Sequence, residues 1–177
     1  REAEEAKPAR IAELIHAYRS RGHLMADVDP LSSRPRRHPD LDIQTHGLTI
    51  WDLDRVYHTG GFAGRDRQKM REVLARLRDA YCRTIGVEYM HIQNTDEQQW
   101  IQEKFEGPQE PTSKAQKDRI LERLNAAESF EKFLATKYVG TKRFGLQGAE
   151  SAIPILDAVL EAAADADLDG ILMGMAH

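Results

Sequence analysis

Apolar residues recur at helical spacing in the first half of the chain. One such set, with members three or four positions apart, consists of Ile11, Leu14, Ile15 and Tyr18. Gly22 follows this set in the position of a helix C-cap. A second set stands on a strongly charged background and comprises Met70, Val73, Leu74, Leu77, Ala80 and Tyr81. The spacing predicts two amphipathic helices, and the second has the clearest apolar stripe in the sequence.

Irregular segments separate these helices. The stretch from His23 to about Gly47 is rich in proline and lacks a period, which predicts a long connection with little regular structure. Thr49 is expected to cap a short helix, with Asp52 three residues later as the second member of a capping box. The glycine-rich sequence HTGGFAG is expected to end that helix.

The second half begins with further helical patterns and then changes character. Helices are predicted in DEQQWIQEKF and in SKAQKDRILERLNAAESFEKFLATK, which forms one helix or two. After Gly140, the loop KRFGLQG leads into a helix with Pro154 in its first turn. An apolar run, Ile171–Met175, follows, and apolar residues on both faces are typical of a strand inside a covered parallel sheet.

These patterns predict a mostly α-helical segment with two parts. Residues 1–140 form a helical region, and residues 141–177 begin an α/β domain with its first helix and strand. A single buried strand would leave its backbone donors and acceptors unsatisfied. We therefore expect the rest of the sheet to come from sequence beyond His177 or from another chain.

Composition excludes several classes of protein. The chain has 177 residues, of which 41% are hydrophobic and 31% charged, as in a globular protein. A net charge of -4 argues against a nucleic-acid-binding protein. The single cysteine, Cys82, excludes an internal disulfide and favours the cytoplasm. No apolar stretch reaches the ~20 residues of a membrane span, so no membrane association is expected. Arg1 in place of Met indicates that the sequence begins inside a longer polypeptide.

The candidate catalytic residue is His177. It follows the predicted strand, and open α/β sheets bind ligands at the carboxyl ends of their strands. Imidazole can act there as an acid or base, or as a hydrogen-bonding group. The alternative is a histidine that only ends the strand.

Other candidates have simpler structural explanations. The run Lys142–Phe144 could bind an anion, but a solvated basic turn fits better because no phosphate-loop spacing is present. Two aspartate pairs could bind a metal, although turn and cap roles suffice for them, namely Asp27 with Asp29 and Asp52 with Asp54. The remaining histidines lack the spacing of a zinc site, and Cys82 fits a packed thiol.

Four phrases in order carry a resemblance to a known family. They are GHLMADVDPL, YCRTIGVEYMHI, KYVGTKRFGLQGAES and GMAH. Together they resemble the N-terminal part of the thiamine-diphosphate-dependent first component of the 2-oxoglutarate dehydrogenase complex, especially its actinobacterial members, which include multifunctional 2-oxoglutarate decarboxylases. The resemblance covers essentially the whole chain. One departure is Gln147, where the family usually has Glu.

The resemblance implies a function for the parent protein. It implies decarboxylation of 2-oxoglutarate with thiamine diphosphate and Mg²⁺, both bound by residues beyond this segment. The succinyl-level product would pass to a lipoyl-bearing acyltransferase component, or be released or ligated. His177 would lie in the active site of a homodimeric enzyme, residues 141–177 would begin the thiamine-diphosphate-binding domain, and the isolated segment would be inactive. The alternative is a non-catalytic helical module for protein interaction.

Overall fold

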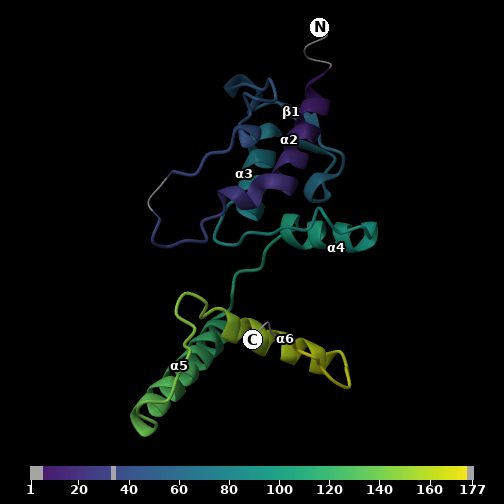
Figure 1. Ribbon diagram of the computed structural model, residues 1–177. Coiled ribbons are helices and arrows are strands. Elements are labelled where there is room, and N and C mark those ends of the chain that lie inside the picture. The colour runs from purple at the N-terminus through teal and green to yellow at the C-terminus, as the bar shows by residue number, and fades with distance from the viewer. Residues whose placement is uncertain (1–5, 33–34, 175–177) are drawn as a thin grey trace. The chain divides into compact units, whose positions relative to one another are not determined.

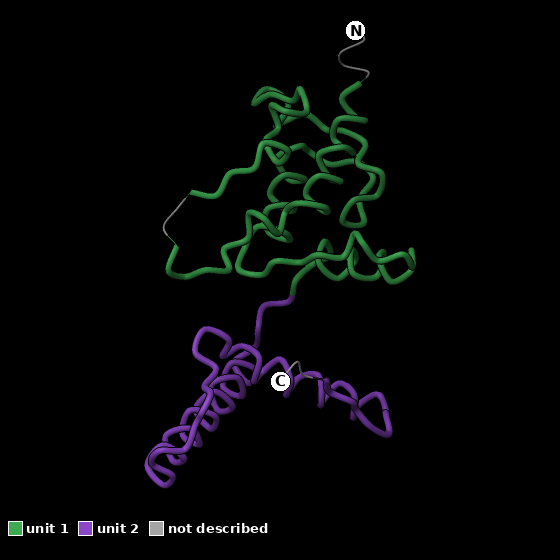
Figure 2. Tube along the Cα trace, viewed as in Figure 1, with its two compact units in different colours: residues 1–109 green, residues 110–177 purple. Residues whose placement is uncertain are grey.

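The computed structural model describes residues 6–32 and 35–174, and the chain divides into two compact units. Residues 1–109 form unit 1 and residues 110–177 form unit 2 (Figure 2). This division comes earlier in the sequence than the expected boundary after residue 140. The reason is that the long helix preceding that boundary packs against the helix that follows it. The extent of a thiamine-diphosphate-binding domain stays a prediction.

The described residues of unit 1 include three α-helices, which confirms the helices predicted in this part of the chain. They are α2 (Lys7–Arg21), α3 (Met70–Tyr81) and α4 (Thr95–Glu106) (Figure 1). Short 3-10 helices interrupt the connections, namely η1 (Gly22–Met25), η2 (Pro39–Leu41), η3 (Ile50–Asp52) and η4 (Phe62–Gly64). The segment between α2 and η3 is otherwise mostly irregular, as its prolines predicted.

The core of unit 1 lies where α2 packs on α3. The predicted apolar stripes supply it: Ile11 and Leu14 of α2, with Val73 and Leu77 of α3, are fully buried. Burial of each such side chain contributes about 1.5–3 kcal/mol. The remaining buried apolar side chains of this core come from both helices and from the connecting segments, and include Tyr18, Leu41, Leu48, Phe62, Met70, Tyr81 and Tyr89.

Gly22 ends α2, as predicted, but for a different reason from the one expected. A C-cap glycine usually adopts a left-handed conformation. Gly22 instead has a φ of -57° and continues directly into η1. A Cβ atom at Gly22 would collide with the Cβ of Tyr81. The glycine therefore permits close approach of the end of α2 to the end of α3.

A small β-hairpin was not predicted. Strands β1 (Val56–His58) and β2 (Arg67–Lys69) pair antiparallel, with Tyr57 opposite Gln68. Each strand has three residues, too few for an alternating pattern to stand out in the sequence. The glycine-rich loop between the strands contains η4, and β2 leads directly into α3.

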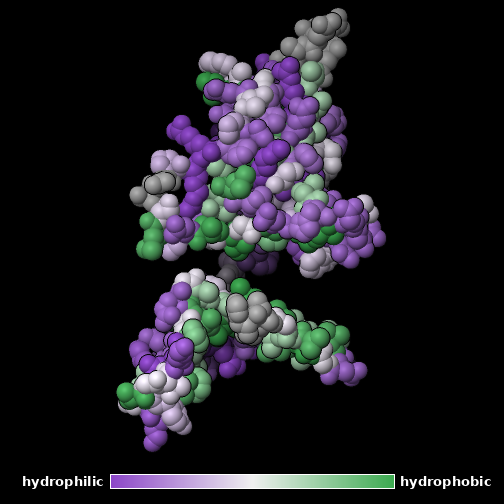
Figure 3. Space-filling model, viewed as in Figure 1, coloured by the Kyte–Doolittle hydropathy of each residue, from purple (hydrophilic) through white to green (hydrophobic). Residues whose placement is uncertain are grey.

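Unit 2 consists of two helices, again as predicted. They are α5 (Lys114–Lys137), a single helix, and α6 (Ala152–Asp165), which has Pro154 in its first turn. Among the described residues of this unit none is buried, and many large apolar side chains are exposed. Figure 3 shows a largely hydrophobic surface over α6. The exposed apolar residues of this helix include Ile155, Leu156, Val159 and Leu160. Unit 2 therefore has no core of its own among its described residues.

The predicted strand over residues 171–175 is not formed. Residues 171–174 are irregular and exposed, and residue 175 lies outside the described part of the chain. A strand requires a hydrogen-bonding neighbour, and the only sheet among the described residues is the hairpin of unit 1. The expected parallel sheet stays a prediction. In the described ranges, no helix combines the length and apolar character that crossing a membrane requires.

Candidate functional site

His177, the predicted catalytic residue, lies outside the described residues. The structure describes the chain that leads to it, through α6 and then residues 166–174. Ile171, Leu172 and Met173 in that segment are all exposed. The catalytic role of His177 is therefore a prediction from position and family resemblance alone.

The loop before α6 has a structural role at the end of α5. The Arg143 guanidinium donates hydrogen bonds of 3.5 Å to the carbonyl oxygens of Leu134 and Tyr138, at the C-terminus of α5. A cation at this end of a helix is favourable because the helix dipole is negative there. Phe144 is 91% exposed, and Gln147 is exposed as well. These contacts favour the basic-turn interpretation of Lys142–Phe144 over an anion site.

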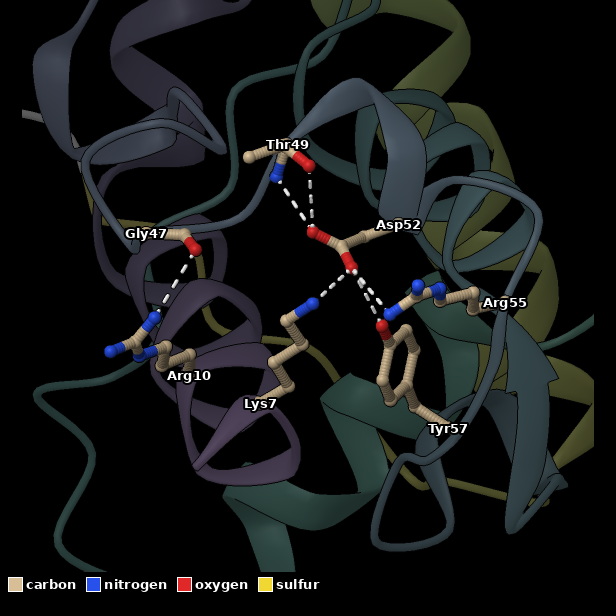
Figure 4. Close-up of polar contacts among 7 residues, drawn as sticks. All are labelled: Lys7, Arg10, Gly47, Thr49, Asp52, Arg55 and Tyr57. Atoms are coloured by element: carbon tan, nitrogen blue, oxygen red, sulfur yellow. Dashed lines mark hydrogen bonds and ion pairs between the residues drawn. The ribbon is translucent and has the colours of Figure 1, made fainter. Parts of the chain in front are cut away.

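The carboxylate of Asp52 is 1% exposed and accepts several hydrogen bonds in unit 1 (Figure 4). It accepts hydrogen bonds from Lys7 Nζ at 2.7 Å and from the Tyr57 hydroxyl at 2.8 Å. Its second oxygen accepts from the backbone N–H of Thr49 at 2.9 Å and from the Thr49 hydroxyl at 3.0 Å. Arg55 lies 3.7 Å away. This arrangement confirms the predicted capping box and extends it to α2 and β1.

The charge of Asp52 is stabilised by these donors. Burial by itself would raise the pKa of the carboxyl, but the hydrogen bonds from Lys7, Thr49 and Tyr57 outweigh burial and hold the pKa well below its usual range. Asp52 is therefore ionised at neutral pH, and both of its carboxylate oxygens accept hydrogen bonds. Such a carboxylate holds elements together and is unsuited to proton transfer.

A second buried polar cluster lies where α2, α3 and α4 meet. Glu106, the last residue of α4, is 3% exposed and accepts two hydrogen bonds from Arg19, at 2.7 and 2.8 Å. It also accepts one from the Tyr81 hydroxyl at 2.6 Å, and the hydroxyls of Tyr81 and Tyr89 lie 2.8 Å apart. Arg76 donates to the backbone carbonyl of Glu106. The cluster fastens α4 to the rest of the core.

Burial dominates the acid-base properties of this cluster. Burial and the neighbouring Glu106 carboxylate raise the pKa of Tyr81, and burial raises the pKa of Tyr89 to about 12. Both tyrosines are neutral donors at physiological pH. Sequence analysis missed this cluster. A carboxylate at the C-terminal end of a helix, where the dipole disfavours it, was the signal that could have found it.

The other aspartates that might have bound a metal have structural partners. Asp27 accepts a hydrogen bond from Arg36 at 2.6 Å, and Asp29 accepts one from the N–H of Leu31 in a turn. Asp54 forms an ion pair with Arg71 at 2.7 Å. The turn role is confirmed for Asp29, whereas the ion pairs of Asp27 and Asp54 were not predicted.

The described residues of unit 1 line a larger and a smaller surface cleft. The larger, of about 1330 Å³, lies beside α3 and the segment after η1 and is lined by several arginines. Two of these are already paired with carboxylates, Arg36 with Asp27 and Arg83 with Asp79. The smaller cleft, of about 630 Å³, lies between the glycine-rich loop and α4, above the Arg19–Glu106 pair. Among the residues that line either cleft, no candidate catalytic acid and base are hydrogen-bonded to each other while lacking other partners.

Cys82, His16 and His38 have local structural contacts. Burial raises the pKa of the Cys82 thiol to about 11, and its Sγ lies 3.7 Å from the carbonyl oxygen of Gly22. This confirms the predicted packed thiol. His38 accepts a hydrogen bond from the N–H of Asp40 as a helix cap, and His16 contacts Ser20.

The family resemblance implies that thiamine diphosphate and Mg²⁺ are bound by residues beyond this segment. A diphosphate–magnesium site needs oxygen ligands and a loop that approaches the phosphates. Within residues 6–32 and 35–174, no group of three or more histidine, cysteine or acidic side chains could hold a metal ion. The glycine loop KRFGLQG closes the end of α5 instead. No chemical step through the cofactor can be assigned to these residues.

Comparison with known proteins gives relatives of much greater length. The chain is 56% identical over 176 residues to the multifunctional 2-oxoglutarate metabolism enzyme of Mycolicibacterium vanbaalenii, and 61% identical to that of Mycobacterium sp. strain JLS. It is 51% identical to the 2-oxoglutarate dehydrogenase E1/E2 component of Corynebacterium glutamicum. These alignments cover 97–98% of this chain but only 14% of each relative. No protein-family model matches the chain.

Nearly the whole chain is thus similar to one segment of the actinobacterial multifunctional 2-oxoglutarate metabolism enzymes. This confirms the resemblance inferred from the four sequence phrases. The chain spans about one seventh of the length of these relatives.

Proposed function

We propose that this chain is a segment of a thiamine-diphosphate-dependent enzyme that decarboxylates 2-oxoglutarate. The observation that carries the proposal is the similarity, along nearly the entire chain, to enzymes named for 2-oxoglutarate metabolism. The succinyl-level product would pass to a lipoyl group, or be released or ligated. The name of the Corynebacterium glutamicum relative, an E1/E2 component, supports a lipoyl-bearing acyltransferase as the partner.

The character of unit 2 supports its place within a larger catalytic domain. Helix α6 exposes Ile155, Leu156, Val159 and Leu160, and half of its other residues are alanine. A helix that is apolar on most of its surface is typical of the interior of a large protein. We propose that α6 and the apolar segment after it are covered in the full-length enzyme, where residues 171–175 become a strand of a parallel sheet.

The proposed role of this segment in catalysis rests on His177. Thiamine diphosphate with Mg²⁺, bound by residues beyond this segment, would supply the electron sink for decarboxylation. His177 would hydrogen-bond the substrate and move a proton, as imidazole can near neutral pH. Units 1 and 2 would serve as scaffold. A homodimer in the cytoplasm is part of the same proposal.

The test is a substitution in the full-length enzyme. His177→Ala should lower the rate of 2-oxoglutarate decarboxylation by a factor on the order of a hundred, because a positioned acid or base is removed. His91→Ala is the matched control, since His91 is exposed in unit 1 and should leave the rate unchanged. The chain 1–177 alone should show no turnover.

Two results would contradict the proposal. Wild-type full-length protein without decarboxylase activity in the presence of thiamine diphosphate and Mg²⁺ would favour the interaction-module alternative. Full activity of folded His177→Ala protein would remove the catalytic role of this residue. The two outcomes separate the function of the enzyme from the role of its histidine.

A further inference from the structure

Helices α5 and α6 are joined by three ion pairs whose members repeat at one helical turn on each helix. Arg119 Nε lies 2.7 Å from Asp157 Oδ2, and Arg119 Nη1 lies 2.6 Å from Glu161 Oε1. Arg123 Nε lies 3.0 Å from the other oxygen of Asp157. Residues four apart share one face of a helix. A basic face of α5 is therefore matched to an acidic face of α6.

The acidic residues of α6 are conspicuous because the helix has few charges. Its only ionisable residues are Asp157, Glu161 and Asp165. The first two contact the arginines of α5. Apart from Pro154 and its three acidic residues, the helix consists of alanine and aliphatic residues, and the two carboxylates one turn apart mark the face that meets α5.

Apolar packing by itself does not fix the register of these helices. No described residue of either helix is buried, and the alanines of α6 present a smooth surface. A slip of α6 by four residues would move it about 6 Å along its axis. A slip that brings Ile153 to the place of Asp157 would leave Arg119 with one carboxylate, and the opposite slip would put the longer Glu161 in the place of Asp157 and the shorter Asp165 in the place of Glu161. The short contacts of Arg119 with Asp157 and Glu161 are therefore matched to the observed register.

We propose that Arg119 is a positioning residue, which holds α6 in register through Asp157 and Glu161 and thereby sets the place of the segment that leads to His177. This inference rests on the proposed function of His177. Arg119 does not touch the reacting atoms. Its effect on catalysis would pass through α6 and residues 166–174, which follow α6 directly.

The chemistry of the arginine suits this role. A guanidinium presents several N–H donors in a rigid, planar fork and can hold two carboxylates in a fixed arrangement, whereas a lysine ammonium acts as a point charge. Hydrogen bonding from Arg119 lowers the pKa of Asp157, so the carboxylate is charged at neutral pH. Exposed ion pairs contribute little to stability. In this protein, the ion pairs of Arg119 would instead fix the position of α6 on α5.

The experiment uses the full-length enzyme and three variants. Arg119→Ala and Asp157→Asn should each lower kcat for 2-oxoglutarate decarboxylation about tenfold or more, because small displacements of a catalytic group are costly. KM and the thermal midpoint should change little. Arg119→Lys should recover only part of the rate. Lys132→Ala is the control, because Lys132 pairs with Glu128 within α5 and should leave kcat unchanged.

Amide hydrogen exchange provides a readout that does not depend on turnover. Exchange in residues 155–174 should be faster in Arg119→Ala and Asp157→Asn than in wild type or Lys132→Ala. Unchanged exchange in both variants would overturn the proposal, as would unchanged kcat in an active enzyme. Inactive wild-type protein would instead contradict the proposed function, and the exchange experiment would still decide the role of Arg119.

Discussion

The ion-pair and hydrogen-bond network around Asp52 can be tested with one isosteric substitution. Asp52→Asn keeps the size of the side chain and one carbonyl oxygen that can accept from the N–H of Thr49. It removes the charge that faces Lys7 at 2.7 Å, and it leaves the Tyr57 hydroxyl without its anionic acceptor. The new amide N–H₂ also lies close to groups that are themselves donors.

The expected loss of stability follows from burial and from the kind of bonds removed. Asp52 is 1% exposed and the Lys7 side chain is 12% exposed, so water can compensate only in part. Hydrogen bonds to charged groups contribute about 1.5–3 kcal/mol each. Breaking a buried ion pair by removing one partner costs about 3–5 kcal/mol. Because the asparagine retains the cap, we expect Asp52→Asn to lower the free energy of unfolding of unit 1 by about 3 kcal/mol.

The assay is urea unfolding of the chain 1–177, followed by far-ultraviolet circular dichroism. Asp54→Asn is the matched control, because the Asp54 side chain is 71% exposed and its ion pair with Arg71 is a surface pair. Surface pairs contribute about 0–1 kcal/mol. Equal urea midpoints for the two variants would refute the conclusion that Asp52 holds unit 1 together.

Acid provides a second test of the same network. The pKa of Asp52 is lower in the folded chain than the unfolded value of about 3.9. A group of this kind contributes stability above its unfolded pKa, and the contribution is lost as pH falls toward the folded pKa. The difference in stability between wild type and Asp52→Asn should therefore be constant near pH 7 and shrink below about pH 4. A difference that grows in acid would contradict the assignment.

Two further predictions concern the end of α2 and the thiol beside it. Gly22→Ala should destabilise unit 1 by about 1–3 kcal/mol in urea unfolding, because the new methyl group collides with Tyr81, whereas Gly86→Ala, with ordinary contact distances around its Cβ, should change stability little. An unchanged midpoint for Gly22→Ala would show that the approach of α2 to α3 can relax freely. Cys82, whose pKa burial raises to about 11, should react with iodoacetamide at pH 7.5 at least about a hundredfold more slowly than free cysteine in a mass-spectrometric time course. Rapid alkylation of the folded chain would contradict this.

The helices of this protein were determined by local sequence. The stripe from Met70 to Tyr81 specifies α3 and its buried face, because residues at helical spacing lie side by side whatever surrounds them. Thr49 and Asp52 formed the predicted capping box for the same reason, since the partners are three residues apart. The family resemblance likewise came from short phrases that can be recognised without a fold.

Contacts between distant residues depended on the tertiary structure. Glu106 meets Arg19, which is 87 positions away, and no local pattern marks either residue as the partner of the other. The same holds for Gly22, where the neighbouring Tyr81 leaves no room for a side chain. It also holds for Lys7, which donates a hydrogen bond to Asp52 in a capping box that is distant in sequence. Local periodicity determined which segments are helices and which faces are apolar. Only the packed chain determined which charges meet, because the free energy of a buried ion pair depends on neighbours that folding brings together.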